Sequence, residues 1–152
     1  MFDNCEVCKV LPQNNPIFET DKWVATLAFD QGYLGRAYIT LKEHKGDLKD
    51  LSEEEWLEFS KVLKKYEAGV RKAFNAEMFN WTCLMNNAYQ TQPSQPHIHW
   101  HVRPRYSTEI EFKGKTYSDP EFAHHYDRNQ KNLVNSGVLD AINEEIKSCL
   151  SD

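Results

Sequence analysis

Four segments of the chain have the apolar and β-branched composition that predicts β-strands. Two of them, 23–27 and 37–41, are separated by a stretch that contains the glycines of a turn. A third strand is expected at 80–86. The fourth, 97–104, alternates between apolar side chains and histidines in its first six residues. One face of that strand is therefore predicted to be apolar and the other to carry imidazoles.

A long helix is predicted after Ser52, where Ser52 and Glu55 form a capping box. Its apolar residues recur at spacings of three and four from Trp56 to Phe74, so one stripe of the helix must pack against the rest of the protein. Gly69 interrupts this helix at a cost in helix propensity, which indicates a close contact.

The last third of the chain predicts a hairpin within 111–117 and a final helix over 139–150. Ser118 or Asp119 is expected to cap a further helix, because Pro120 suits a first helical position. Strands grouped around one long helix predict an α+β domain, with an antiparallel sheet and helices packed on one side.

The length of 152 residues suits one domain with a real core. No apolar run approaches the length of a membrane span, and the first residues lack the features of a secretion signal. We therefore expect a soluble protein of the cytoplasm with no membrane partner. The net charge of −5 argues against binding long nucleic acids but leaves room for a small phosphorylated ligand.

Cys5 and Cys8 form a Cys-x-x-Cys motif, which in a reducing compartment indicates half of a metal site or a redox pair. Redox motifs of this spacing follow a strand and begin a helix, and no strand can precede Cys5. The metal site is the favoured interpretation. Cys83 lies in an apolar stretch and is expected to be a small core residue.

His97, His99 and His101 occupy alternate positions of the fourth strand, so they share one face and predict a functional site. One possibility is a catalytic zinc, but three ligands spread over about 13 Å of straight strand cannot all reach one ion. The other is a neutral imidazole that attacks phosphorus and forms a covalent phospho-histidine, while a neighbouring histidine protonates the leaving group.

The segment from His97 to Tyr106 resembles the histidine triad motif of the histidine triad (HIT) family, above all its zinc-bearing bacterial Hit, Hint and Fhit-like hydrolases. The Cys-x-x-Cys-Lys at 5–9 and the segment 35–44 resemble further signatures of that family. The resemblance covers about residues 5–106. It implies a HIT domain at 1–106, with a sheet of about five strands, and a C-terminal helical extension at 107–152 that packs on the same domain.

Carried over residue by residue, the resemblance implies that His99 is the nucleophile that attacks an α-phosphate. His101 would contact the phosphate or assist the leaving group, and His97 completes the catalytic triad. The implied nucleotide contacts are Asp30, Asn86, Ser94, His99 and His101. The implied ligands of a structural zinc are Cys5, Cys8, His44 and His97, and two chains are expected to form a homodimer.

Some positions depart from the pattern of the family and leave the substrate open. Arg36 replaces a histidine, Leu41 a proline, Ala88 a glycine and Pro93 a glutamine that Gln92 or Gln95 could replace. The expected function is a nucleotide hydrolase or nucleotidyl transferase that acts on nucleoside phosphoramidates or dinucleoside polyphosphates, with a purine nucleotide or dinucleotide as substrate.

Two other functions are considered for the same motif. One is a HIT-fold interaction protein that binds purine nucleotides without turnover. The other is a hydrolase with zinc on His97 and His101. By default, Arg103 and Arg105 are interpreted as surface charges that would contact phosphate only if they lined a cleft, and His124 and His125 as surface or dimer-contact residues.

Overall fold

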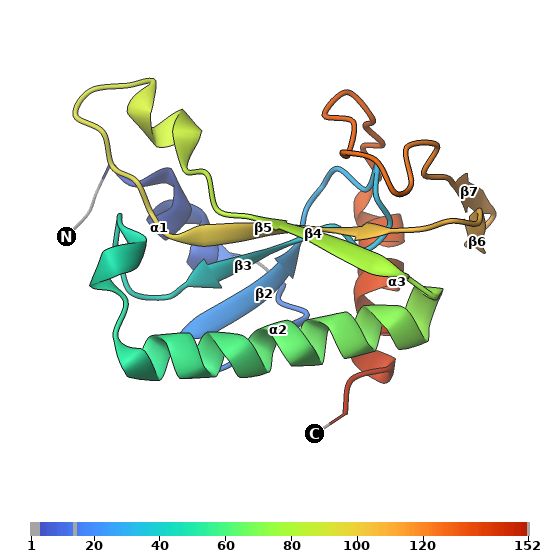
Figure 1. Cartoon of the computed structure of the whole chain (residues 1–152), viewed down its shortest axis with the longest axis horizontal. Helices are drawn as coiled ribbons and strands as arrows, with labels where there is room; N and C mark the ends of the chain where they lie inside the picture. Colours follow the sequence, from blue (N-terminus) through green and yellow to red (C-terminus); the bar gives the residue numbers. More distant parts are fainter. Residues whose placement is uncertain (1–3, 14, 152) are drawn as a thin grey trace.

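The computed structural model describes residues 4–13 and 15–151, and its centre is a five-stranded antiparallel sheet (Figure 1). The strands lie in the order β1-β2-β3-β5-β4. They are β1 (Phe18–Glu19), β2 (Trp23–Leu27), β3 (Ala37–Leu41), β4 (Met78–Thr82) and β5 (His99–Arg105). A separate hairpin pairs β6 (Ile110–Phe112) with β7 (Lys115–Tyr117), as the sequence predicts.

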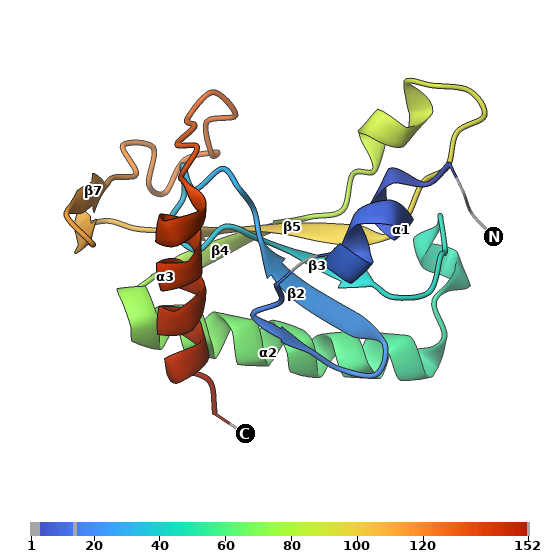
Figure 2. The same ribbon diagram turned by 180° about the vertical axis from the view of Figure 1, so that it is seen from behind.

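Three α-helices and three short 3-10 helices complete the described chain: α1 (Glu6–Val10), η1 (Leu11–Gln13), η2 (Leu48–Asp50), α2 (Glu53–Phe74), η3 (Asn86–Tyr89) and α3 (Ser136–Ser148). The long helix α2 runs along one face of the sheet, and α3 crosses it near its end (Figures 1 and 2). Among the described residues, no helix has the length and apolar character needed to cross a lipid bilayer.

The predicted capping box at the start of α2 is present, with Ser52 and Glu55 each accepting a hydrogen bond from the other's backbone N–H. The apolar stripe of α2 packs on the sheet, where Phe59 stacks on Trp100 of β5 with ring centroids 5.0 to 5.1 Å from both Trp100 and Trp23. Tyr66 is fully buried and its hydroxyl donates to the Gly35 carbonyl at 2.6 Å. This face of the sheet is therefore the core of the domain.

Gly69 marks the close contact that its position in α2 predicts. A Cβ at residue 69 would lie 2.7 Å from Leu150 Cδ2 and 3.6 Å from Ile146 Cγ2. Both partners belong to the C-terminal segment, because α3 ends at Ser148 and Leu150 follows it. The absence of a side chain at 69 thus allows α3 to pack directly against α2.

Several sequence-based expectations are wrong, among them a fourth strand that begins at His97, since β5 begins at His99. The third predicted strand is β4 at Met78–Thr82 rather than 80–86, because the chain leaves the sheet before Met85, whose φ of 54° is left-handed. No helix follows Ser118 or Asp119 in the described chain, which forms turns there. The Asp119 carboxylate accepts hydrogen bonds from Arg105 and from the Tyr106 N–H instead of capping a helix.

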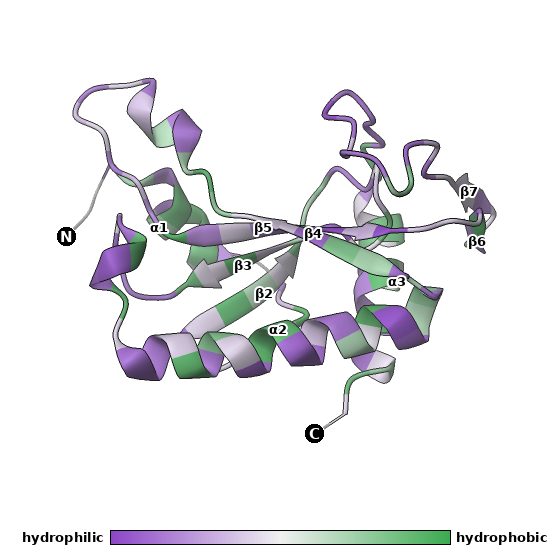
Figure 3. Ribbon diagram, viewed as in Figure 1, coloured by the Kyte–Doolittle hydropathy of each residue, from purple (hydrophilic) through white to green (hydrophobic). Residues whose placement is uncertain are grey.

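The face of the sheet opposite α2 carries polar side chains in register. Tyr38 and His101 are direct partners across β3 and β5, and Thr40 and His99 are the next pair. Since Trp100 packs on α2, its neighbours His99 and His101 point to the opposite face. Two mainly hydrophilic segments rise beside this face, one containing η3 and one between β7 and α3 (Figure 3).

Candidate active site

A cavity of about 750 Å³ lies over the polar face of the sheet, a size typical of small-molecule sites. Side chains of four strands line it: Thr26, Tyr38, Thr40, Thr82, His99 and His101. Residues of α1 and η3 line it at one end, and Arg36, Arg103, Tyr126 and Arg128 also contribute. The cavity therefore brings together residues from distant parts of the chain, and all three triad histidines line it.

His99 lines the cavity, and one of its two ring nitrogens is hydrogen-bonded within the chain. Its Nδ1 lies 2.7 Å from the His97 carbonyl oxygen, and because a carbonyl can only accept, Nδ1 carries the proton. In the neutral ring, Nε2 then keeps its lone pair. Among the described residues Nε2 has no hydrogen-bond partner, and His99 lines the cavity. This tautomer is the one that a nucleophilic imidazole requires.

His101 follows His99 on the same face, with the ring centroids 5.0 Å apart. The Tyr38 ring lies edge-on to His101 at 4.9 Å. Burial, together with the nearby charges of His99, Arg103 and Arg36, lowers the pKa of His101 to about 3. His101 is therefore neutral at physiological pH in the unliganded site.

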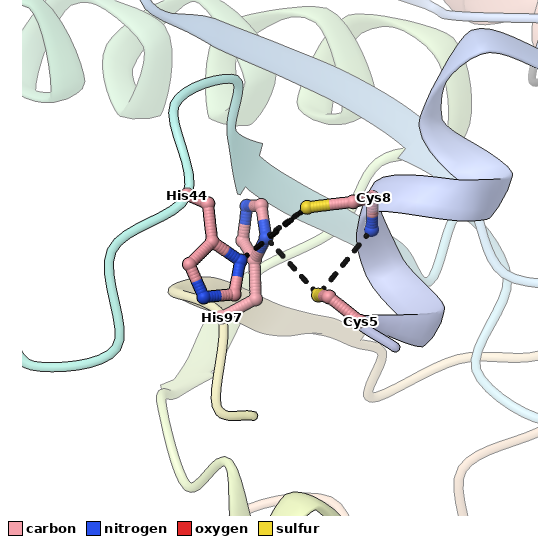
Figure 4. A group of neighbouring side chains, drawn as sticks. All are labelled: Cys5, Cys8, His44 and His97. Carbon is pink, nitrogen blue, oxygen red and sulfur yellow. Dashed lines mark hydrogen bonds between the residues drawn. The ribbon is translucent and has the colours of Figure 1, made fainter. Parts of the chain in front are cut away.

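His97 lies outside the regular strand, two residues before β5 begins, and is buried. Its Nδ1 lies 3.3 Å from Cys8 Sγ and 3.6 Å from Cys5 Sγ. His44 Nδ1 lies 3.3 Å from Cys8 Sγ. The four ligand atoms all lie within 4.8 Å of one another, and Figure 4 shows both rings turned toward the two sulfurs.

The donor set fits a tetrahedral zinc. Bonds of about 2.3 Å to sulfur and about 2.0 Å to nitrogen place neighbouring S and N ligands about 3.5 Å apart. The three S–N distances of 3.3, 3.3 and 3.6 Å match that spacing. His97 Nε2 donates to the Leu41 carbonyl at 2.6 Å, which leaves the lone pair on Nδ1, the nitrogen that faces the thiols. Such a closed Cys₂His₂ site is of the structural kind.

This geometry separates His97 from the other two histidines. Within the described residues, Cys5, Cys8, His44 and His97 form the one converging group of potential metal ligands, and His101 is not in it. The arrangement therefore disfavours the alternative in which His97 and His101 share a catalytic zinc. All four cysteines are free thiols.

Arg103 and Arg105 are both buried, so the interpretation of them as surface charges is wrong. Arg105 is fully buried, and its Nε and Nη2 pair with the two oxygens of Asp119 at 2.7 and 3.0 Å. Its remaining donors reach the Asn80 side chain and the carbonyls of Glu121 and His124. Arg105 thus joins the end of β5 to the segment after β7.

Arg103 faces the cavity instead. Its guanidinium lies 4.1 Å from the ring centroid of Tyr126, a cation–π contact. Arg36 also lines the cavity and pairs with Asp30 at 2.7 Å. Burial lowers the pKa of Arg103, and the charge of Arg36 lowers it further. Two cations are therefore held near each other beside His101.

Several buried polar atoms at the cavity lack a partner among the described residues. They are Arg36 Nε, Thr82 Oγ1, Gln95 Oε1 and Arg103 Nη1. Buried polar groups are nearly always hydrogen-bonded, so such atoms indicate a place for a ligand or water. Gln95, one of two residues considered as a substitute for the missing glutamine, therefore does lie at the cavity, as does Pro93.

Some of the nucleotide contacts predicted from the sequence line the cavity, and others do not. Asn86, His99 and His101 line the cavity, whereas Asp30 and Ser94 are not among its lining residues. The Asp30 carboxylate is already engaged by Arg36 and by the N–H groups of Gly32 and Asn132. In this conformation Asp30 positions Arg36 and the C-terminal segment.

Sequence reasoning missed Tyr38, Tyr126 and Arg128 as cavity residues. Tyr38 could have been found, because it alternates with apolar residues on a predicted strand. Tyr126 and Arg128 lie in an irregular segment whose position depends on long-range contacts, including Gln31 N–H to the Asn132 carbonyl and Asp127 N–H to the Tyr33 hydroxyl. His124 and His125 are exposed, as expected for surface residues.

The profile of the HIT domain matches residues 12–108, which include the strand with the three histidines. The chain belongs to the HIT family. It is 28% identical over 101 residues to galactose-1-phosphate uridylyltransferase of Thermotoga maritima, and this match spans 64% of the chain but 32% of the relative. It is also 28% identical over 105 residues to adenosine 5'-monophosphoramidase hnt1 of Schizosaccharomyces pombe, spanning 67% of the chain and 74% of the relative.

Solved structures of HIT proteins share the fold of the whole chain. A hypothetical histidine triad nucleotide-binding protein from Sulfolobus tokodaii superposes with a TM-score of 0.71 at 17% identity, covering 95% of this chain and 91% of that one. A zinc-bound histidine triad protein from Mycobacterium smegmatis superposes with a TM-score of 0.59 at 21% identity, covering 96% and 95%. The predicted α+β fold with its C-terminal helix is confirmed.

Proposed function

We propose that this HIT protein is a nucleotide hydrolase or nucleotidyl transferase that acts through a covalent nucleotidyl-histidine on His99. Its substrates are nucleoside phosphoramidates or dinucleoside polyphosphates. The observation that carries the proposal is the His99 ring, which lines the cavity, donates its Nδ1 proton to the His97 carbonyl and leaves Nε2 without a partner among the described residues. The relatives named as a phosphoramidase and a uridylyltransferase support this reaction class.

In the first step, the Nε2 lone pair of His99 forms a P–N bond with the α-phosphorus. The bond from phosphorus to the leaving group breaks, and its electron pair departs with that group. His101 contacts the phosphate oxygens, and a leaving group that needs a proton takes it from His101 once the phosphate has raised its pKa, or from water. The His97 carbonyl stabilises the positive charge that develops on the ring.

In the second step, an acceptor attacks the phosphorus and the P–N electron pair returns to Nε2. With water as the acceptor the products are a nucleoside monophosphate and a proton, so the protein is a hydrolase. With a second phosphate as the acceptor the protein is a transferase. Both outcomes use the same intermediate on His99.

We further propose that Cys5, Cys8, His44 and His97 hold a structural zinc. When bound, the metal supplies cross-linking between α1, the segment after β3 and the start of β5, rather than a reacting water. His97 then acts by fixing the backbone carbonyl that orients His99. A cytoplasmic location, a homodimer and the boundary at residue 106 stay predictions of the sequence.

The test is His99→Asn, assayed by hydrolysis of adenosine phosphoramidate and of diadenosine tetraphosphate. Removal of a nucleophile is expected to lower kcat by several orders of magnitude while AMP still binds in calorimetry. His124→Asn, which changes an exposed histidine outside the cavity, is the matched control and is expected to retain activity. Mass spectrometry of the quenched wild-type protein is expected to find a nucleotidyl group on the peptide that carries His99.

Turnover by His99→Asn close to the wild-type rate would exclude His99 as the nucleophile. Wild-type protein that binds AMP but turns over neither substrate would favour the alternative of a nucleotide-binding interaction protein.

A further inference from the structure

Beyond His101, β5 continues the polar face with a third cavity residue, Arg103. His99, His101 and Arg103 alternate along β5, so their side chains share a face and succeed one another at about 6.5 Å. All three line the cavity. Any group bound against Arg103 therefore lies next to a phosphate bound at the two histidines.

Arg103 is held without a counter-ion. Its side chain forms no ion pair with the described residues, and it is 9% exposed. The guanidinium lies 4.1 Å from the Tyr126 ring centroid. This cation–π contact involves the guanidinium charge and gives its N–H groups no hydrogen-bond acceptor. Nη1 is buried and has no hydrogen-bond partner among the described residues. A buried cation with an unpaired N–H donor destabilises the folded state unless a ligand or water accepts a hydrogen bond from it.

Arg36 and Arg128 bring two further cations to the same cavity. Arg36 pairs with Asp30 through Nη1, while its Nε is buried and has no partner in the described chain. The positive charges of Arg36 and Arg103 both act on His101 and lower its pKa, so both lie beside this histidine rather than at the α1 end. Among the described residues, Arg36 is the one member of these three arginines that forms an ion pair.

We propose that Arg36, Arg103 and Arg128, with Tyr126, form a subsite for a second phosphoryl group of the substrate, adjacent to the phosphate that His99 attacks. The subsite rests on the proposed function and narrows it. It selects substrates in which the α-phosphate continues into a phosphate chain or lies next to another phosphorylated group. A phosphoramidate, whose amine carries no anion, leaves the three arginines unused.

The chemistry of the leaving group also favours substrates with a phosphate chain over phosphoramidates. A phosphate or nucleotide leaving group is a stable anion that needs little protonation, whereas an amine needs a proton. Burial holds His101 neutral, with a pKa of about 3, so it is a poor proton donor for an amine in the unliganded site. The arginines instead stabilise the negative charge of a departing phosphate through charge-assisted hydrogen bonds.

The test compares AMP with ADP as ligands, by calorimetry with the full chain at fixed ionic strength. The wild type is expected to bind ADP about 10- to 100-fold more tightly than AMP, the range of a charge-assisted contact. Arg103→Met is expected to remove most of this preference and to change the AMP affinity less than about threefold. Lys61→Met, on the exposed side of α2, removes the same charge away from the cavity and is expected to keep the preference.

Arg128→Met provides a second variant at an exposed cavity residue, so the test does not depend on Arg103→Met folding. Equal losses of AMP and ADP affinity in the Arg103 or Arg128 variants would overturn the subsite, because the arginines would then hold the reacting phosphate. A wild type with no preference for ADP would also overturn it. The affinity comparison does not depend on which residue is the nucleophile, so failure of the nucleophile assignment is recognised separately, by the activity of His99→Asn.

Discussion

The two ends of strand β5 are held by opposite kinds of chemistry. Before the strand, His97 lies in a cluster of two cysteines and two histidines whose ligand atoms fit a metal. At the other end, Arg105 is a buried cation whose guanidinium pairs with Asp119 and with three further acceptors. The cluster needs an added ion to be complete, whereas the Arg105 network is complete within the chain.

The difference shows what each end contributes to the site between them. His99 is oriented by the carbonyl of His97, so the geometry of the nucleophile depends on the end that is proposed to bind zinc. The segment that contributes Tyr126 is attached through Arg105, which donates to the carbonyls of Glu121 and His124. One end therefore orients the reacting group and the other positions a wall of the cavity.

The largest expected effect comes from breaking the Arg105 network. Asp119→Ala leaves a buried guanidinium without its carboxylate, which is expected to cost about 3–5 kcal/mol of stability, measured by urea denaturation. Asp140→Ala, at an exposed position of α3, removes an equal charge and is expected to change stability by less than about 0.5 kcal/mol. Similar losses in both variants would contradict a special role for the buried pair.

An intermediate effect is expected at the cysteine–histidine cluster. Zinc at about a hundred times its Kd adds about 2.7 kcal/mol to the free energy of unfolding, and a chelator removes that increment. Cys8→Ser is expected to lower the zinc content and to lose the response to chelator, while Cys149→Ser keeps both. A wild type whose unfolding midpoint is the same with and without chelator would show that no stabilising metal binds there.

The smallest effect is expected when one contact of Arg105 is removed and its carboxylate is kept. Asn80→Ala removes the 2.8 Å hydrogen bond to Nη1, but Nη1 still donates to the His124 carbonyl at 2.9 Å. The expected cost in urea denaturation is about 1 kcal/mol. A loss as large as that of Asp119→Ala would mean that the amide, rather than the ion pair, dominates this end of β5.

The chemistry before β5, around His97, could be predicted in part from the sequence, whereas the Arg105 network at the other end of the strand could not. The Cys-x-x-Cys spacing and the alternation of histidines are local patterns, so half of a metal site and the polar face of β5 were predictable from them. His44 and His97 joined the expected ligand set only through the resemblance to the HIT family. The partner of Arg105 lies fourteen residues away, across a hairpin and a turn, and nothing local distinguishes Arg105 from a surface arginine. The failed helix after Asp119 has the same cause, because a tertiary ion pair uses the carboxylate that would have capped it.

The proton of His99 Nδ1 rests on a main-chain oxygen rather than on a side chain. Every amino acid at position 97 would offer the same acceptor, so replacing that residue changes the partner's location but never its chemical identity. A substitution at position 97 therefore leaves the tautomer of the attacking ring unchanged unless it moves the backbone.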